Sequence, residues 1–224
     1  WMATKSGFFE YDREADQLNL VREGFSWKIM VYEDSKGFIW VGSSGDGLDR
    51  YDPATNTWQH FEHDPENPSS LNNNFVEAIH EDSAGNLWFA TGGGLNQFNP
   101  DTQTFKSYLV KDGLPHDYVN GILEDDQGNL WLTTLGGITK FNPNLEAFTN
   151  FDKSDGLQSN FFWRNAYHQT GVGEFIFGGE NGFNIFCGQF TIILFVDRHA
   201  RGRIALTQTL RRLKCEHPVC SRRA

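Results

Sequence analysis

The stretch LEDDQGNLWLTTLGGITKFNPNLEAFTNF, residues 123–151, decides the fold because it recurs twice upstream almost without gaps. Residues 80–108 read HEDSAGNLWFATGGGLNQFNPDTQTFKSY, and residues 32–61 read YEDSKGFIWVGSSGDGLDRYDPATNTWQHF. A unit that returns at a fixed period of about 43 residues indicates a repeat architecture. Each copy carries one anchor tryptophan at the same position: Trp40, Trp88 and Trp131.

Each copy reads as four short strands separated by turn residues. In one copy the strands are expected at residues 76–81, 87–91, 95–98 and 105–108. The turn Asp82-Ser-Ala-Gly85 places Asp and Gly where a type I turn prefers them. Four antiparallel strands per unit with one aromatic anchor are typical of a β-propeller blade. The sequence therefore predicts an all-β fold.

The repeat extends in both directions beyond the three complete copies. Trp1 falls on the anchor position of a copy that lacks its first strand, and Ile176 takes the anchor position in a fifth copy. The prediction is a β-propeller fragment of about four to five four-stranded antiparallel blades within residues 1–186. Its units are a partial blade 1–21, blades 25–61, 71–108 and 114–151, and a partial blade 157–186.

Residues 187–224 differ from the rest in charge, cysteine content and arginine frequency. Residues 1–186 carry 27 acidic and 11 basic residues, whereas residues 187–224 carry 2 and 8. The three cysteines, Cys187, Cys215 and Cys220, also lie there. We expect a basic tail outside the propeller, either a frameshifted or foreign C-terminus or a genuine accessory segment.

The acidic body would repel phosphate backbones, so we expect no nucleic-acid partner. The longest apolar run, Phe190–Val196, is far shorter than the roughly 20 residues of a membrane helix, so we expect no membrane segment. Residues 1–3 do not resemble a signal peptide.

Several residue patterns that suggest binding or catalysis can also be explained by a purely structural role. The anchor tryptophans could stack on sugars, but their shared register on a blade strand favours inter-blade packing. The Glu-Asp pairs recur once per blade, which favours turn capping over acid–base catalysis. Cys215, His217 and Cys220 provide three zinc ligands without a fourth. We expect no catalytic residue, metal or cofactor.

A polar position recurs at the start of each innermost strand. Because these strands surround the propeller axis, their starts gather at one mouth of the central channel, where polar groups beside aromatic rings suit a ligand. The alternative is that each polar side chain caps its own loop through a hydrogen bond to the backbone. The candidate ligand-binding residues are Ser26, Asn74, Asp117, Tyr118, Asn160 and Trp163.

The repeats resemble those of the two-component regulator propeller family. The resemblance is carried by Gly113-Leu114-Pro115, Glu124-Asp125, Gly128-Asn129-Leu130-Trp131 and the segment from Gly137 to Pro143. It implies the periplasmic sensor region of a hybrid two-component histidine kinase, which responds to a carbohydrate or other soluble ligand and signals as a homodimer. The pattern breaks after Phe186, where Cys187-Gly188 replaces the expected Asp-Pro.

Three functions remain open at this point. The first is a ligand-sensing propeller module, with oligosaccharide as the expected ligand. The second is a protein-interaction scaffold, which needs no small-molecule site. The third is a propeller enzyme similar to streptogramin lyase, for which His116 is the one candidate base. The lack of catalytic motifs favours a protein that is not an enzyme.

Overall fold

The structure is a computed structural model that describes residues 1–24, 30–187 and 190–195. Its strands form five antiparallel sheets, and in each sheet consecutive strands pair. The strands, sheet by sheet, are β1 (Met2–Thr4), β2 (Gly7–Asp12) and β3 (Gln17–Glu23); β4 (Met30–Glu33), β5 (Ile39–Gly42), β6 (Leu48–Asp52) and β7 (Thr57–Phe61); β8 (Val76–Glu81), β9 (Leu87–Thr91), β10 (Gly94–Asn99) and β11 (Thr104–Tyr108); β12 (Val119–Glu124), β13 (Leu130–Thr134), β14 (Gly137–Asn142) and β15 (Ala147–Phe151); β16 (Phe162–Gln169), β17 (Glu174–Gly179), β18 (Gly182–Cys187) and β19 (Phe190–Phe195).

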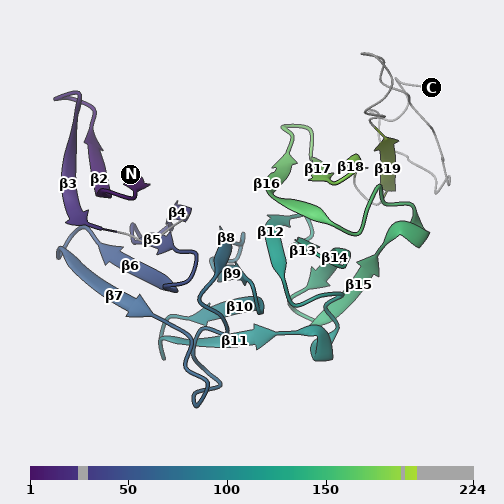
Figure 1. Ribbon diagram of the computed structural model, residues 1–224, viewed down its shortest axis with the longest axis horizontal. Helices are drawn as coiled ribbons and strands as arrows, with labels where there is room; N and C mark the ends of the chain where they lie inside the picture. Colours follow the sequence, from purple (N-terminus) through teal and green to yellow (C-terminus); the bar gives the residue numbers. More distant parts are fainter. Residues whose placement is uncertain (25–29, 188–189, 196–224) are drawn as a thin grey trace.

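The five sheets follow one another around an arc that is open between the first and the last sheet (Figure 1). The first strands of successive sheets, β4, β8, β12 and β16, lie on the inner side of the arc and contact their neighbours. The fourth strands, β7, β11 and β15, lie on its outer side. This is the blade arrangement of a β-propeller, as the sequence predicts. Besides strands, the described residues contain two single-turn 3₁₀ segments, Val110–Asp112 and Lys153–Asp155.

The anchor tryptophans are buried between neighbouring sheets, which confirms the packing interpretation. Trp40, Trp88 and Trp131 are 1%, 0% and 5% exposed. Each ring contacts an aromatic side chain on the third strand of the next sheet. The ring centroids lie 5.1 Å apart for Trp40 and Phe98, and 5.8 Å apart for Trp88 and Phe141. Aromatic burial therefore holds each sheet to the next.

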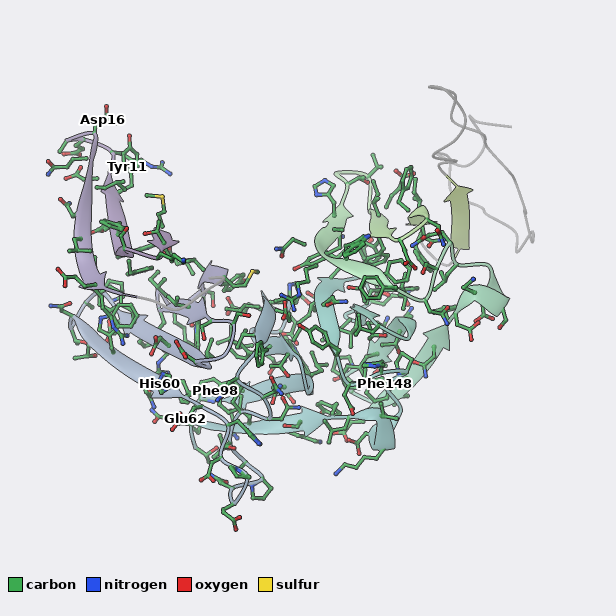
Figure 2. The ribbon with its side chains drawn as sticks, in the orientation of Figure 1. Tyr11, Asp16, His60, Glu62, Phe98 and Phe148 are labelled. Atoms are coloured by element: carbon green, nitrogen blue, oxygen red, sulfur yellow. The ribbon has the colours of Figure 1, made fainter. Side chains whose placement is uncertain are left out.

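Tyr11 occupies in the first sheet the position that Phe98 occupies in the third. Phe98 is buried against Trp40 of the preceding sheet, whereas Tyr11 is 47% exposed. Figure 2 shows Tyr11 beside Asp16 at the β2–β3 turn, where its hydroxyl donates a hydrogen bond of 2.5 Å to the Asp16 carboxylate. The exposure of Tyr11 follows from its place at the end of the arc.

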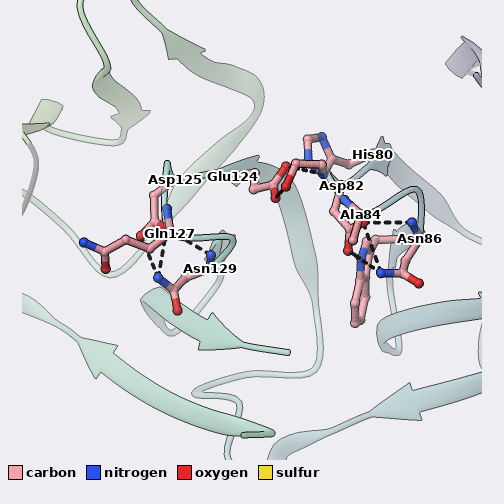
Figure 3. A network of polar contacts seen from close by, with 10 residues as sticks. His80, Asp82, Ala84, Asn86, Glu124, Asp125, Gln127 and Asn129 are labelled. Carbon is pink, nitrogen blue, oxygen red and sulfur yellow. Dashed lines mark hydrogen bonds and ion pairs between the residues drawn. The ribbon is translucent and has the colours of Figure 1, made fainter. Parts of the chain in front are cut away.

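The turn between the first two strands of each complete repeat is closed in the predicted way. The Gly85 N–H donates to the Asp82 carbonyl at 2.8 Å, and Gly128 does the same to Asp125. The Asp82 carboxylate also accepts the indole N–H of Trp88 at 2.8 Å, in addition to backbone N–H groups of the turn (Figure 3). This aspartate therefore joins the turn to the anchor tryptophan, a link absent from the sequence-based prediction.

The corresponding carboxylate of Asp125 is held in its charged form. Burial by itself would raise its pKa, but hydrogen bonds from Trp131 and Asn129 together with the Lys140 ammonium, 3.1 Å away, outweigh burial and lower the pKa. Hydrogen bonds that favour the ionised carboxylate have this effect. The aspartates of these turns are structural, as their recurrence in every complete repeat suggests.

A second contact recurs between sheets and involves the serine that follows the turn aspartate. The Ser35 N–H and hydroxyl donate to the Glu81 carboxylate at 2.7 and 2.6 Å. In the next pair of sheets, Ser83 donates to Glu124 in the same way, at 2.8 and 2.7 Å. We call this contact the serine–glutamate clamp. It gives the glutamate of the Glu-Asp pair a structural contact in two of the three complete repeats.

We expect Ser83→Ala to lower the free energy of unfolding by about 0.5 to 1.5 kcal/mol, because it removes one hydroxyl bond to a carboxylate. The measurement is equilibrium denaturation in urea. Asp126 takes the position of Ser83 in the fourth sheet, and the described structure records no hydrogen bond from its side chain, so Asp126→Ala is the control. Equal effects of the two substitutions would contradict a stabilising clamp.

The C-terminal boundary of the strands differs from the prediction. The last blade was expected to be partial and to end at residue 186, but β18 continues to Cys187 and β19 pairs with it along Phe190–Phe195. The last sheet thus has four strands within the described residues. Strand pairing uses backbone groups, so it does not require the Asp-Pro turn of the repeat. Residues 196–224 lie outside the described residues, and their separation from the propeller stays a prediction.

Candidate functional site at the starts of the inner strands

The predicted polar positions lie directly before the inner strands β8, β12 and β16, at one end of the sheets. Asn74 precedes β8 by two residues, as do Asp117 and Asn160 in the next two sheets. Their common place follows from the repeat, because each inner strand begins after the loop that enters its sheet. Ser26, the fourth predicted position, lies outside the described residues.

Each of the three described polar side chains closes its own entry loop. The Asp117 carboxylate accepts the Val110 N–H at 2.7 Å, and the Asn160 amide oxygen accepts the Lys153 N–H at 2.8 Å. Both bonds span seven residues. Asn74 accepts the His63 N–H at 2.6 Å across eleven residues, because its loop is about four residues longer. The local capping that was the alternative for this position is therefore present in all three loops.

Tyr118 lies at the centre of a cluster that joins three sheets. Its hydroxyl donates a hydrogen bond to the Glu77 carboxylate at 2.6 Å. Arg164 forms an ion pair with the same carboxylate at 2.9 Å and a hydrogen bond to the Tyr118 hydroxyl. The guanidinium also lies 5.5 Å from the centre of the tyrosine ring. Glu77 comes from β8, Tyr118 precedes β12 and Arg164 comes from β16.

The electrostatics of this cluster keep Tyr118 protonated. Burial and the nearby Glu77 carboxylate raise the pKa of Tyr118 to about 12, although Arg164 opposes the shift. Glu77 is 6% exposed, so its charge needs the guanidinium nearby. Arg164 Nη1 is buried and has no hydrogen-bond partner among the described residues. The cluster thus offers one unused, buried donor group.

Two exposed aromatic residues lie close in the chain to members of the cluster: Trp163 precedes Arg164, and Phe75 lies two residues before Glu77. Trp163 is 51% exposed and packs edge-on against Phe161, with ring centroids 4.9 Å apart. Phe75 is 45% exposed and lies beside Gly92, which also faces Tyr118. A Cβ at Gly92 would stand only 3.3 Å from Phe75 and 3.5 Å from Tyr118. Aromatic faces beside hydrogen-bonding groups can bind a sugar ring.

The sequence analysis named Tyr118 and Trp163 as candidate ligand-binding residues but did not identify Glu77. Within β8, Glu77 is a charged residue between buried Val76 and Ala78. A charge in an inner strand is costly unless it is paired, and that was the available signal. Its partners Tyr118 and Arg164 lie in other repeats, so the pairing itself was not visible in any single copy.

A groove lies away from this cluster, at the outer edge of the sheets. It has a volume of about 730 Å³ between the long loop after β7 and the outer strand β11, and its lining includes His63, Asn67, Lys106 and Lys111. The loop reaches this strand because the Phe105 N–H donates to the Ser69 carbonyl at 2.8 Å. Of the predicted site residues, the groove includes Asp117 alone.

Two further observations concern the described residues. They contain no group of three or more His, Cys, Asp or Glu side chains arranged to hold a metal ion. None of the helices among them has the length and apolar composition needed to cross a membrane. His116, the candidate base of the enzyme hypothesis, accepts the Tyr118 N–H at 2.9 Å through Nδ1.

Comparison with protein families gives a match to the family described as two component regulator propeller, at residues 70–93 and 113–136. Both matched segments run from the entry loop through the inner strand into the turn after the anchor strand, and so cover the same part of two repeats. These two segments are similar to repeats of the two component regulator propeller family. The matched segments contain Asn74 and Asp117, which close the entry loops. They also contain the two tryptophans, Trp88 and Trp131, whose indole N–H groups donate to the turn aspartates.

Comparison of the chain with solved structures supports the fold. The extracellular domain of a hybrid two-component system from B. thetaiotaomicron is 25% identical with a TM-score of 0.61, and the match covers 73% of this chain and 23% of that one. A second such domain from the same organism is 21% identical with a TM-score of 0.50, covering 87% and 33%. This chain therefore spans about a quarter to a third of their lengths.

A propeller of another kind is also similar in fold. The virginiamycin B lyase from Staphylococcus aureus is 14% identical with a TM-score of 0.57, and the match covers 83% of this chain and 61% of that one. Identity this low relates the folds and says nothing of activity. No curated protein sequence matches this chain.

Proposed function

We propose that this chain is a ligand-sensing propeller module of a two-component signalling receptor, located in the periplasm, which binds an oligosaccharide at the mouth formed by the inner strands. The observation that carries the proposal is the cluster of Glu77, Tyr118 and Arg164 with its unused donor group. The similarity to the extracellular domain of a hybrid two-component system supports the signalling context.

The proposed site does not use all of the polar residues predicted from the sequence as ligand contacts. Because Asn74, Asp117 and Asn160 already accept backbone N–H groups, we assign them to shaping the loops. Tyr118 and Arg164 would provide hydrogen bonds to ligand hydroxyl groups, and Trp163 would stack on a sugar ring. A ligand held there would touch the fourth and fifth sheets together, so binding would favour one arrangement of the sheets. In the parent receptor, this change would pass through a dimer.

The experiment is a titration of neutral and acidic oligosaccharides, followed by tryptophan fluorescence, because Trp163 is exposed at the site. We expect Tyr118→Phe to weaken binding roughly tenfold, the order of magnitude of one hydrogen bond to a charged network. Trp163→Ala should weaken binding and remove most of the fluorescence change. Tyr11→Phe, which changes an exposed tyrosine of the distant first sheet, is the matched control.

Equal affinities for wild type, Tyr118→Phe and Trp163→Ala would contradict a site at this mouth. No response from any protein across the panel would favour the alternative function, a protein-interaction scaffold. That alternative is favoured by one observation: the side-chain oxygens of Asn74, Asp117 and Asn160 already accept backbone N–H groups. A lyase activity similar to that of streptogramin lyase is the third possibility, and cleavage by elimination that depends on His116 would support it.

A further inference from the structure

The charges of the cluster at the proposed site cancel one another. The Glu77 carboxylate is 6% exposed and lies 2.9 Å from the Arg164 guanidinium, so the cation of the cluster is already paired with an anion. Tyr118 adds no charge at neutral pH, because burial and the Glu77 carboxylate raise the pKa of its hydroxyl to about 12. A ligand that reaches these three side chains therefore meets polar groups with no net charge.

The hydrogen-bonding capacity left in the cluster is of both kinds. Arg164 Nη1 has no acceptor among the described residues. The Tyr118 hydroxyl donates to Glu77 and accepts from Arg164, which leaves its oxygen one lone pair. A sugar hydroxyl group can accept a hydrogen bond from the guanidinium and donate one to the Tyr118 oxygen, whereas a carboxylate or sulfate can only accept.

The loops around these side chains are acidic. The entry loops of the third, fourth and fifth sheets span residues 62–75, 109–118 and 152–161, and together they carry seven acidic residues and two lysines. Two further carboxylates, Asp46 and Glu180, lie in turns that bond to these loops. The Gly45 N–H donates to the Asn74 carbonyl, and the Glu180 N–H donates to the Phe161 carbonyl. An anionic ligand would be repelled as it approached this end of the sheets.

We infer that the site selects uncharged oligosaccharides over those that carry carboxylate or sulfate groups, and that Glu77 sets this selectivity. The inference rests on the proposed function, since it concerns the same site. Without Glu77, Arg164 would present an unpaired guanidinium, a group well suited to carboxylates and sulfates. Because Glu77 is almost fully buried, it acts by compensating the charge of Arg164.

The test compares matched pairs of ligands on the full chain. Each pair consists of an oligogalacturonide or oligomannuronide and the same oligosaccharide after reduction of its carboxyl groups to primary alcohols. In isothermal titration, the neutral member should bind roughly 5- to 10-fold more tightly than the acidic one, because the acidic loops repel the latter. Added salt should narrow this ratio by strengthening the binding of the acidic member, and should leave the neutral member unchanged.

Substitution of Glu77 tests which residue sets the ratio. Glu77→Gln keeps the size of the side chain and leaves Arg164 unpaired, so the acidic member should gain roughly tenfold in affinity relative to the neutral one. Glu146→Gln is the matched control, because it makes the same change in net charge at the β14–β15 turn, at the other end of the fourth sheet. Should Glu77→Gln fail to fold by circular dichroism, the ratio and its salt dependence in the unsubstituted chain decide the selectivity.

The outcomes separate this inference from the proposed function. Acidic members that bind the unsubstituted chain as tightly as their neutral partners, with a loss on Trp163→Ala, would overturn the selectivity and leave the site in place. An equal gain for Glu77→Gln and Glu146→Gln would remove Glu77 as its determinant. Absence of binding by every member of the panel would contradict the proposed function and the inference together.

Discussion

Replacement of Trp88 by alanine lowers the free energy of unfolding by about 3 to 5 kcal/mol, the largest effect we expect from a side-chain truncation here. Trp88 is fully buried and lies between Tyr108 of its own sheet and Phe141 of the next. Truncation leaves a cavity at the junction of two sheets and also removes the indole donor from the buried Asp82 carboxylate.

The measurement is equilibrium unfolding in urea monitored by far-ultraviolet circular dichroism. Trp88→Phe separates the two contributions, because it keeps most of the packing and loses the 2.8 Å bond to Asp82. We expect it to cost about 1 to 3 kcal/mol. Trp163→Ala changes a tryptophan that is 51% exposed, so it should cost less than about 1 kcal/mol. Similar losses for Trp88→Ala and Trp163→Ala would contradict the assigned roles.

Gly137→Ala should lower the free energy of unfolding by roughly 3 kcal/mol or more. Gly137 begins β14 with φ of 127°, a conformation that residues with a Cβ rarely adopt. A Cβ there would also overlap the carbonyl oxygen of Phe151 on the neighbouring strand. Neither atom can move easily, because both belong to the paired backbones of β14 and β15.

Gly171→Ala is the matched control for this glycine. A Cβ at Gly171 would meet no atom within 4 Å, and its φ is not in the positive range. We expect a change within about 0.5 kcal/mol, or a slight stabilisation from the reduced entropy of the unfolded chain. Thermal unfolding of the two variants measures the difference. A loss at Gly137 no larger than at Gly171 would contradict the strained turn.

The repeat made the fold predictable, because the same residue returns to the same environment in each copy. The anchor tryptophans and the Asp-x-x-Gly turns could be assigned from spacing alone, and the structure confirms both. The fourth strand of the last sheet could not, since β19 lacks the repeat motif and pairs through its backbone. A strand of this kind has no sequence signal beyond its apolar composition.

The candidate site was less predictable than the fold. Asn74, Asp117 and Asn160 were found by register, but whether such oxygens face a ligand or the adjacent loop depends on backbone geometry that the spacing does not contain. The cluster around Tyr118 joins residues separated by 41 and 46 positions in the chain. Such a contact depends on how successive sheets are placed, and Glu77 occurs in one copy, so self-comparison could not reveal it.

The serine–glutamate clamps and the tryptophan contacts have a consequence for cooperativity. Both link a sheet to its immediate neighbours along the arc, so these contacts enter the free energy of the molecule as nearest-neighbour terms, as in a linear array. The Glu77–Arg164 ion pair, which joins the third and fifth sheets, is an exception. In the isolated chain, opening should then begin at a sheet that contacts one neighbour among the described residues and advance inward one unit at a time. The central third sheet, with neighbours on both sides, would exchange its amide hydrogens last, and its protection would approach the global unfolding limit.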